Sequence, residues 1–214
     1  MSHARLSIID LDEERGRQPF RSADGRWLLA QNGEFYDYKR IRAMAVARGA
    51  RFRTKSDSEI VLHLAPVLGL EDTLPHLRGE FAFALWDDER ETLSLVRDRF
   101  GIKPLYWTSI GGTLVFGSEL KVLFAHPEVP RRFDPAGLYH QLMQTMVPGT
   151  TPFEGIEQVP PGHVLSVRRR DGRLQIDLRR YWDMPFPEAS AHAELGDEEA
   201  VEAVREKLLE AVQL

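Results

Sequence analysis

The stretch RGEFAFALWDDERETLSLVRDRFGIKPLYW, residues 78–107, decides the fold class of this chain. Its segment 81–87 is apolar at nearly every position, which predicts a strand that is covered on both faces. The turn DDER leads into a second strand over 92–98, so the two strands form a hairpin. Turn dipeptides at 111–112 and 171–172 predict two further hairpins of the same kind. The middle of the chain is therefore expected to be antiparallel β-sheet.

Helical patterns lie before this β-rich middle. Apolar residues at helical spacing predict a helix over 37–49. Ser56 and Glu59 have the spacing of a capping box ahead of a second helix. Pro66 is expected to end or kink that second helix near Ala65, because proline disrupts a helix interior.

The remaining elements complete a layered arrangement. Two early strands are predicted over 5–11 and 26–33, the second ending in Gly33. Asp134 is a suitable N-cap for a helix whose first residue is Pro135. Helices on either side of a strand-rich middle indicate an α+β domain, with antiparallel sheets between helical layers.

Composition narrows the classes of function. The 214 residues carry a formal net charge of −5, which lacks the basic character of nucleic-acid-binding proteins. There is no cysteine, so disulfides and thiolate metal sites are excluded within this sequence, as is a cysteine nucleophile. The seven histidines are scattered, no nucleotide-binding motif is present, and no apolar run reaches membrane length. We therefore expect no metal, no nucleic acid and no membrane partner, and a cytoplasmic location.

Polar residues at the ends of predicted elements could form a binding site. The pair Asn32-Gly33 offers a side-chain amide beside an unhindered backbone N–H, a donor pair suited to a developing oxyanion. Asp57 could accept hydrogen bonds from an ammonium group, and Arg5 could grip a carboxylate. Simpler interpretations stay open: a turn glycine, a helix-start aspartate and a surface arginine.

Eight motifs in order make the sequence recognisable: RLSIIDL, G-x-QP, NGEFYDY, SDSEIVL, L-x-GEFAFALWD, RDRFGIKPLYW, FGSELKVL and PPGHVLSV. From about Ala4 to Trp182 the chain resembles the glutaminase domain of glutamine-hydrolysing asparagine synthetases. The resemblance implies a four-layer α/β/β/α sandwich of antiparallel sheets, of the N-terminal-nucleophile hydrolase type. NGEFYDY departs from the family pattern at Phe35 and Asp37, which leaves the expected pocket residues untouched.

The resemblance also implies roles for particular residues. Arg5 would hold the α-carboxylate of L-glutamine, while Asp57 and Glu34 face its α-amine. The Asn32 side chain and the Gly33 N–H would form the oxyanion hole. The pocket would further be lined by the backbone of Leu6, Ser7, Ile8 and Ile9.

In the family, an N-terminal cysteine exposed by removal of Met attacks the glutamine amide. The segment that carries this cysteine, with its strand, is absent from the sequence. We therefore expect a glutaminase domain over 1–183 without its nucleophile and first strand or strands, inactive by itself. A linker over 184–197 and a helix over 198–214 would lead into an ATP-using synthetase domain that amidates aspartate. That missing domain would bind ATP and Mg, and this chain no cofactor.

Alternatives of other classes stay open. The chain could be a non-catalytic glutamine-binding or interaction module that has lost its nucleophile. It could also be the amidotransferase domain of a related synthetase that forms β-lactams or modifies peptides. A third alternative makes Ser2 the nucleophile after removal of Met, although Ser2 lies at most ~11 Å before Arg5 along one extended stretch. The sequence does not decide whether the protein forms a homodimer.

Overall fold

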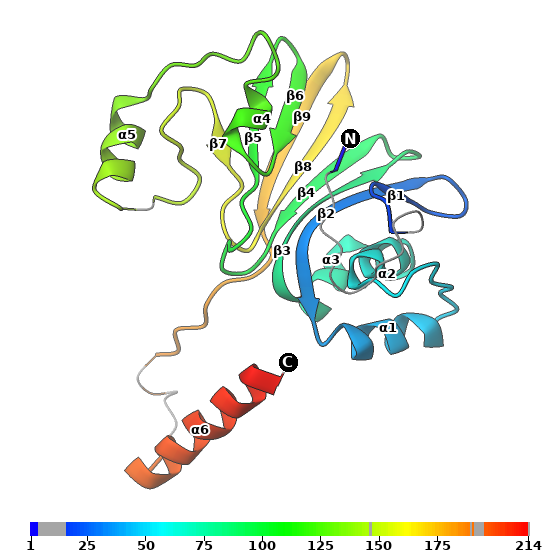
Figure 1. Cartoon of the computed structure of the whole chain (residues 1–214), viewed down its shortest axis with the longest axis vertical. Coiled ribbons are helices and arrows are strands. Elements are labelled where there is room, and N and C mark those ends of the chain that lie inside the picture. The colour runs from blue at the N-terminus through cyan, green and yellow to red at the C-terminus, as the bar shows by residue number, and fades with distance from the viewer. Residues whose placement is uncertain (4–15, 146, 189, 191–194, 214) are drawn as a thin grey trace. The chain divides into compact units, whose positions relative to one another are not determined.

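The computed structural model describes residues 1–3, 16–145, 147–188, 190 and 195–213 (Figure 1). The chain divides into two compact units, Met1–Trp182 and Asp183–Leu214. The strand predicted over 5–11 lies outside the described residues. The first unit contains the β-sheets, and the second contains one long helix.

Two antiparallel sheets are found in the described part of the first unit. The larger has six strands in the order β1-β2-β3-β4-β8-β9, and the smaller has three in the order β6-β5-β7. The strand bounds are β1 Phe20–Arg21, β2 Trp27–Tyr36, β3 Arg78–Asp87, β4 Thr92–Arg97, β5 Tyr106–Ile110, β6 Thr113–Gly117, β7 Glu157–Gln158, β8 His163–Arg170 and β9 Arg173–Arg180. The three predicted hairpins are confirmed as β3–β4, β5–β6 and β8–β9.

Helices cover the outer faces of these sheets. Those near the six-stranded sheet are α1 Tyr38–Ala47, η1 Asp57–Glu59, α2 Ile60–Leu68, α3 Leu70–Thr73 and η2 Leu74–His76. On the three-stranded sheet the covering helix is α4 Leu120–Leu123, while α5 Pro135–Leu142 buries only Gly137. Figure 1 shows α1, α2 and α3 together on the concave side of the larger sheet. The second unit contains α6 Asp197–Gln213, and no helix in the described residues is long and apolar enough to cross a membrane.

Strand β3 lies at the centre of the packing. Phe81, Phe83 and Leu85 join the apolar core beneath α1 and α2. The alternate residues Ala82 and Ala84 belong to a second core, together with residues of the three-stranded sheet. Both faces of β3 are therefore buried, as its continuous apolar run predicts. A third core beneath α4 completes the four layers, and the α+β sandwich is confirmed.

The predicted end of β2 at Gly33 is wrong. The strand continues to Tyr36 and stays in register with β3 throughout. Gly33 has a φ of +109°, and Gly79 on the facing strand has a φ of +143°. A Cβ at Gly33 would overlap the carbonyl oxygen of Glu80, and one at Gly79 would overlap that of Glu34. The two glycines let the backbones approach closely, so the strand does not have to stop at this point.

The start and the end of α2 also differ from the predictions. Ser56 caps the turn by accepting from the N–H of Ser58, but Glu59 does not reach back to Ser56 as a capping box requires. Its carboxylate accepts instead from the N–H groups of Arg53 and Thr54. Pro66 does not end α2 near Ala65, because the helix continues to Leu68 before Gly69.

Other helix predictions are confirmed. Gly49, with a φ of +90°, follows α1 at the predicted end. The carboxylate of Asp134 accepts from the N–H of Gly137 at 2.6 Å, and Pro135 is the first residue of α5. The helix predicted over 198–214 is α6, whose described residues end at Gln213. Asp134 and Pro135 act as predicted because both signals are local.

Candidate functional site

The register between β2 and β3 places two predicted site residues on one face. Asn32 lies opposite Ala82, and Glu34 lies opposite Glu80. Because directly opposed residues of an antiparallel pair share a face, Asn32 lies on the side of Ala82, which packs toward the second sheet. Glu34, two residues further, lies on the same face. The Asn32 and Glu34 side chains are therefore at the inter-sheet surface of β2.

Gly33 and Asp57 contribute to the edge of β2 that faces away from β3. The N–H of Gln31 points to the edge away from β3 and donates to Gln18 at 2.6 Å. The N–H of Phe35 points to the same edge and donates to the carboxylate of Asp57 at 2.7 Å. Alternation along the strand places the N–H of Gly33 between these two, on that edge. Asn32, Gly33 and Glu34 are consecutive on β2, and Asp57 contacts the backbone of the next residue, Phe35.

Asp57 is a buried carboxylate, with 3% of its surface exposed. Its second oxygen lies 3.4 Å from the hydroxyls of Ser56 and Ser58. Burial raises the pKa of Asp57, although the N–H of Phe35 and the other hydrogen bonds act in the opposite direction. Since burial disfavours its charged form, a cation beside this carboxylate would stabilise the ionised state.

A second group of carboxylates lies on the same end of the sheet. Glu34 and Glu80 oppose each other directly, and Lys103 lies 3.6 Å from the carboxylate of Glu80. Burial raises the pKa of Tyr36, and the nearby charges of Glu80, Glu34 and Asp98 raise it further. The carboxylates of Glu34, Glu80 and Asp98 thus lie near Tyr36, and Lys103 pairs with that of Glu80.

The loop that carries Lys103 is built by the RDRFGIKP motif. The carboxylate of Asp98 accepts from the N–H groups of Phe100 and Ile102 at 3.1 and 3.0 Å, and from that of Lys103 at 3.0 Å. The guanidinium of Arg97 donates to three carbonyl oxygens, including that of Lys103 at 2.9 Å. In this loop, Arg97 and Asp98 are structural residues that place Lys103.

Sequence reasoning missed Glu80 and Lys103 as neighbours of the site. Both belong to motifs that carry the resemblance, but nothing local indicates that they meet. The remaining predicted residues, Arg5, Leu6, Ser7, Ile8 and Ile9, lie outside the described residues, so their roles stay predictions. Among the described residues, no group of three or more His, Asp or Glu side chains is arranged to hold a metal ion.

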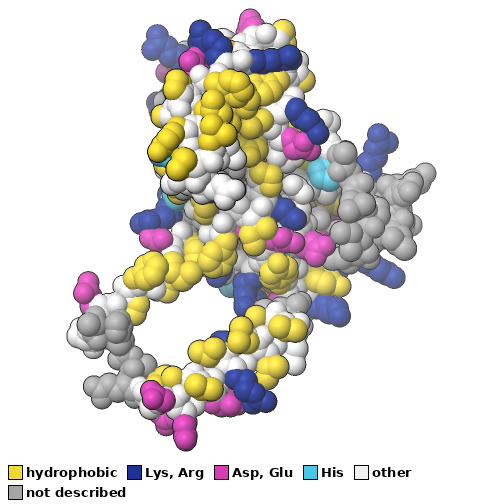
Figure 2. Space-filling model, turned by 60° about the vertical axis from the view of Figure 1, so that its left-hand side comes forward, with side chains coloured by type: hydrophobic (Ala, Val, Ile, Leu, Met, Phe, Trp, Pro, Cys, Tyr) yellow, Lys and Arg dark blue, Asp and Glu magenta, His cyan; other side chains and the backbone are white. Residues whose placement is uncertain are grey.

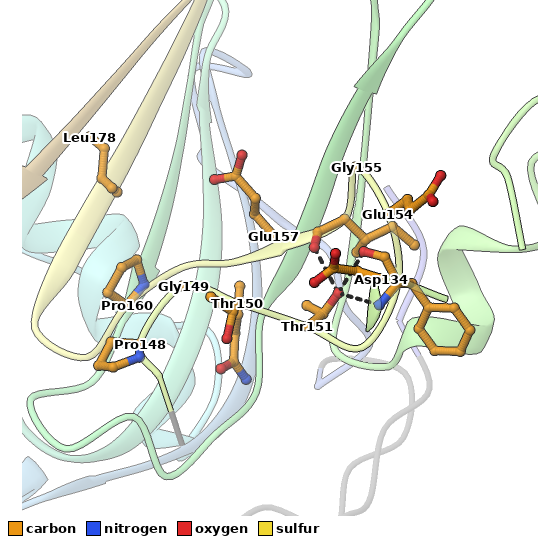
Figure 3. A pocket seen from close by; sticks show the side chains of 13 residues that line it. Asp134, Pro148, Gly149, Thr150, Thr151, Glu154, Gly155, Glu157, Pro160 and Leu178 are labelled. Atoms are coloured by element: carbon orange, nitrogen blue, oxygen red, sulfur yellow. Dashed lines mark hydrogen bonds between the residues drawn. The ribbon is translucent and has the colours of Figure 1, made fainter. Parts of the chain in front are cut away.

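A cavity of about 650 Å³ lies elsewhere, beside β7 and the segment before it (Figure 3). No predicted site residue lines it. Thr151, near its centre, donates through its hydroxyl to the carbonyl of Ile156 at 2.7 Å, and Asp134 caps α5. Glu154 pairs with Arg132 at 2.9 Å. These polar groups are engaged in holding the surrounding segment together.

Surface charge is mixed on the face seen in Figure 2. Basic and acidic side chains are interspersed there with apolar ones, and neither sign forms a continuous surface on this face. The distribution agrees with the small negative net charge of the sequence.

Comparison with known proteins places these residues in a family. Residues 1–182 match the family model of the glutamine amidotransferase domain. The chain belongs to this family. Asparagine synthetase [glutamine-hydrolyzing] 3 of Bacillus subtilis is 37% identical over 98% of this chain and 33% of its own length. Amidase chry2 of Gibberella zeae is 41% identical over the whole chain and 31% of its own length.

The resemblance to the class II amidotransferase domain of asparagine synthetases is confirmed by these matches. The chain spans about a third of the length of the curated relatives it matches. Among solved structures, the glutamine PRPP amidotransferase of Bacillus subtilis has a TM-score of 0.58 at 22% identity, over 84% of this chain and 34% of its own. That likeness agrees with the N-terminal-nucleophile fold.

Proposed function

We propose that this chain forms the glutamine site of a larger glutamine-hydrolysing asparagine synthetase, from which ammonia is supplied for amidation of aspartate. The observation that carries the proposal is the grouping of Asn32, Gly33, Glu34 and Asp57 at one end of β2. A donor pair beside carboxylates suits a ligand that has both a carbonyl group and an amine.

Each described residue has a role in this proposal. Asp57 and Glu34 receive the α-amine of L-glutamine, because a carboxylate can accept hydrogen bonds from an ammonium group. The amide of Asn32 and the N–H of Gly33 bind the side-chain carbonyl and stabilise the oxyanion that forms on attack. The α-carboxylate is assigned to Arg5, and the pocket wall to the backbone of 6–9.

The proposal also assigns domain boundaries to this chain. Residues 1–183 form the amidotransferase domain, 184–197 a linker, and 198–214 the first helix of a synthetase domain. The length of the relatives, about three times that of this chain, supports a further domain in the full protein. That domain would bind ATP and Mg and activate the acceptor, in the cytoplasm. The amidase relative of Gibberella zeae leaves acceptors other than aspartate open.

Calorimetry with L-glutamine tests the site. We expect the 214-residue chain to bind L-glutamine, and Glu34→Gln to weaken that binding at least tenfold, because the contact of a charged amine is lost. Glu157→Gln, which changes a strand glutamate of the other sheet, is the control and should stay within twofold. Absence of binding by the wild-type chain would overturn the proposal.

Ammonia release tests the chemistry. Because the sequence contains no cysteine, we expect the chain to release no ammonia from glutamine above a heat-killed control. Release that is abolished by Ser2→Ala would contradict this expectation and make Ser2 the nucleophile. Binding without release is also what a non-catalytic glutamine-binding module would give, and assay of the full-length protein separates the two.

A further inference from the structure

The outer edge of β2 is held by the side chain of Gln18 next to the short strand β1. β1 is two residues long and pairs with β2 only at Leu28 and Leu29. Beyond that point the amide of Gln18 contacts the backbone of Gln31 twice. The Gln31 N–H donates to Gln18 Oε1 at 2.6 Å, and Gln18 Nε2 donates to the Gln31 carbonyl at 3.2 Å. Gln18 thus reproduces the two hydrogen bonds of a strand neighbour.

Gly33 lies between this contact and a second one. Phe35, on its other side, is held by the carboxylate of Asp57 at 2.7 Å. Gly33 itself has a φ of +109° and no side chain to limit its backbone. The N–H of Gly33 belongs to the peptide that joins Asn32 to Gly33. Its direction therefore depends on the pairing of Asn32 with β3 and on the preceding peptide, whose Gln31 carbonyl accepts from Gln18.

The side chain of Gln31 links the Gln18 contact to Gly33 more directly. It is 2% exposed, and its Nε2 lies 3.5 Å from the carbonyl oxygen of Gly33. Its Oε1 is buried and has no hydrogen-bond partner among the residues that the structure describes, so the contact that holds this amide is the one through Nε2. Gln18, which is 8% exposed, fixes the backbone from which this side chain projects.

We propose that Gln18 is a positioning residue for the oxyanion hole. It acts through Gln31, by holding the outer edge of β2 so that the N–H of Gly33 keeps the direction needed by the glutamine carbonyl. A donor fixed before the ligand arrives needs no reorganisation when charge develops. This inference rests on the proposed glutamine site, and it adds a residue with no contact to the substrate.

Variants of Gln18 separate this role from a general effect on folding. Gln18→Met keeps the length of the side chain and removes both hydrogen bonds, while Gln18→Glu keeps an acceptor for the Gln31 N–H and loses the donor. Gln158→Met is the matched control, because Gln158 is also 8% exposed but lies on β7 of the other sheet. Two ligands are compared: L-glutamine, and L-norvaline, which has the α-amine and α-carboxylate but no side-chain carbonyl.

We expect Gln18→Met to weaken L-glutamine binding about tenfold, in the range of one or two lost hydrogen bonds, and to leave L-norvaline within twofold. Gln18→Glu should lie between Gln18→Met and wild type, and Gln158→Met should change neither ligand. Unchanged glutamine affinity in Gln18→Met would overturn the inference. An equal loss for both ligands would also overturn it, since a loosened fold would affect both.

Amide hydrogen exchange tests this inference separately from the proposed function. If the wild-type chain binds no glutamine, the proposed function fails, but exchange still reports on the edge of β2. We expect Gln18→Met to speed exchange at the Gln31 N–H, which loses its acceptor, at least tenfold relative to Ala84 in the centre of β3. Exchange that is unchanged at Gln31, or that rises equally at Ala84, would overturn the positioning role with or without a ligand.

Discussion

The turn η1 before α2 carries two buried carboxylates, and the protein holds them in different ways. Asp57 faces strand β2 (the strand side), and Glu59 faces the loop at Arg53 and Thr54 (the loop side). On the strand side, Asp57 accepts from the N–H of Phe35, and burial raises its pKa. On the loop side, Glu59 is fully buried and accepts from Thr54 and Arg53. Burial would raise the pKa of Glu59 as well, but hydrogen bonds from His63, Arg53 and Thr54 lower it to about 2.

This difference separates a structural carboxylate from one that can serve a ligand. Glu59 is already neutralised by the protein, so nothing further is needed to keep it charged. Asp57 carries a desolvation cost that its hydrogen bonds do not offset, and an ammonium group from a ligand would offset it. Two acidic residues in one short motif therefore have different functions, which sequence spacing alone does not separate.

The largest effect on stability is expected when the carboxylate of Glu59 is removed. Glu59→Leu leaves the buried N–H and hydroxyl of Thr54 without their acceptor and removes that of the Arg53 N–H. The substitution should lower the free energy of unfolding by about 3–5 kcal/mol. Urea denaturation measures this change. Glu71→Leu, which removes an exposed ion pair with Arg179, is the control and should lower the free energy of unfolding by less than about 1 kcal/mol. A loss below about 1 kcal/mol for Glu59→Leu would contradict the structural role.

Lowering the pH should change the contributions of Glu59 and Asp57 to stability in opposite directions. Glu59 has a pKa of about 2 in the folded chain and about 4.5 when unfolded, so its stabilisation is present above pH 4.5 and disappears as the pH falls to 2. The shift corresponds to about 3 kcal/mol. For Asp57 the raised pKa means stabilisation below pH 3.8 that is lost as the pH rises through its folded value.

Urea midpoints between pH 2 and pH 6 measure this difference. The wild-type chain should lose stability toward pH 2 more steeply than Glu59→Gln, which has no proton to gain at this position. Equal slopes for the two proteins would show that Glu59 does not carry the acid sensitivity. The comparison is made between the variant and the wild type because Asp87 and Asp24 also have lowered pKa values.

A smaller effect is expected at His63, which lies 3.1 Å from Glu59 and packs its ring against Phe52. His63→Leu keeps an apolar contact with Phe52 but removes one hydrogen bond to a charged group, so we expect a loss of about 1–2 kcal/mol. Thermal unfolding measures it, with His140→Leu on α5 as the control. A loss as large as that of Glu59→Leu would mean that His63, rather than the backbone N–H groups, holds the carboxylate.

Elements with local signals could be predicted from the sequence. The three hairpins depend on turns between adjacent strands, and Asp134 and Pro135 mark the start of α5 within two residues. The apolar run of β3 predicts burial on both faces without reference to its partners. For such features the deciding contacts lie within a few residues along the chain.

Features that depend on distant partners were missed. β2 passes through Gly33 because Gly79, on another strand, also lacks a side chain at the close approach. The spacing of Ser56 and Glu59 correctly indicates a helix start, yet Glu59 turns to the loop at Thr54 instead. In the site, Asn32, Gly33 and Glu34 are consecutive and could be found together, whereas the contact of Gln18 with Gln31 depends on tertiary structure.

The smallest effect on stability, and the sharpest test of the strand side, is expected for Asp57→Asn. Its side-chain oxygen can still accept from the N–H of Phe35, and the desolvated charge is removed, so stability at pH 7 should be unchanged or rise by up to about 1 kcal/mol. Glutamine affinity should nevertheless fall at least tenfold, because a neutral amide does not offset the charge of the α-amine. Asp87→Asn, equally buried but paired with Arg26, is the control and should lose stability while keeping affinity. If Asp57→Asn is destabilised like Glu59→Leu, then Asp57 is a second structural carboxylate, and the amine of glutamine must be held by Glu34 without it.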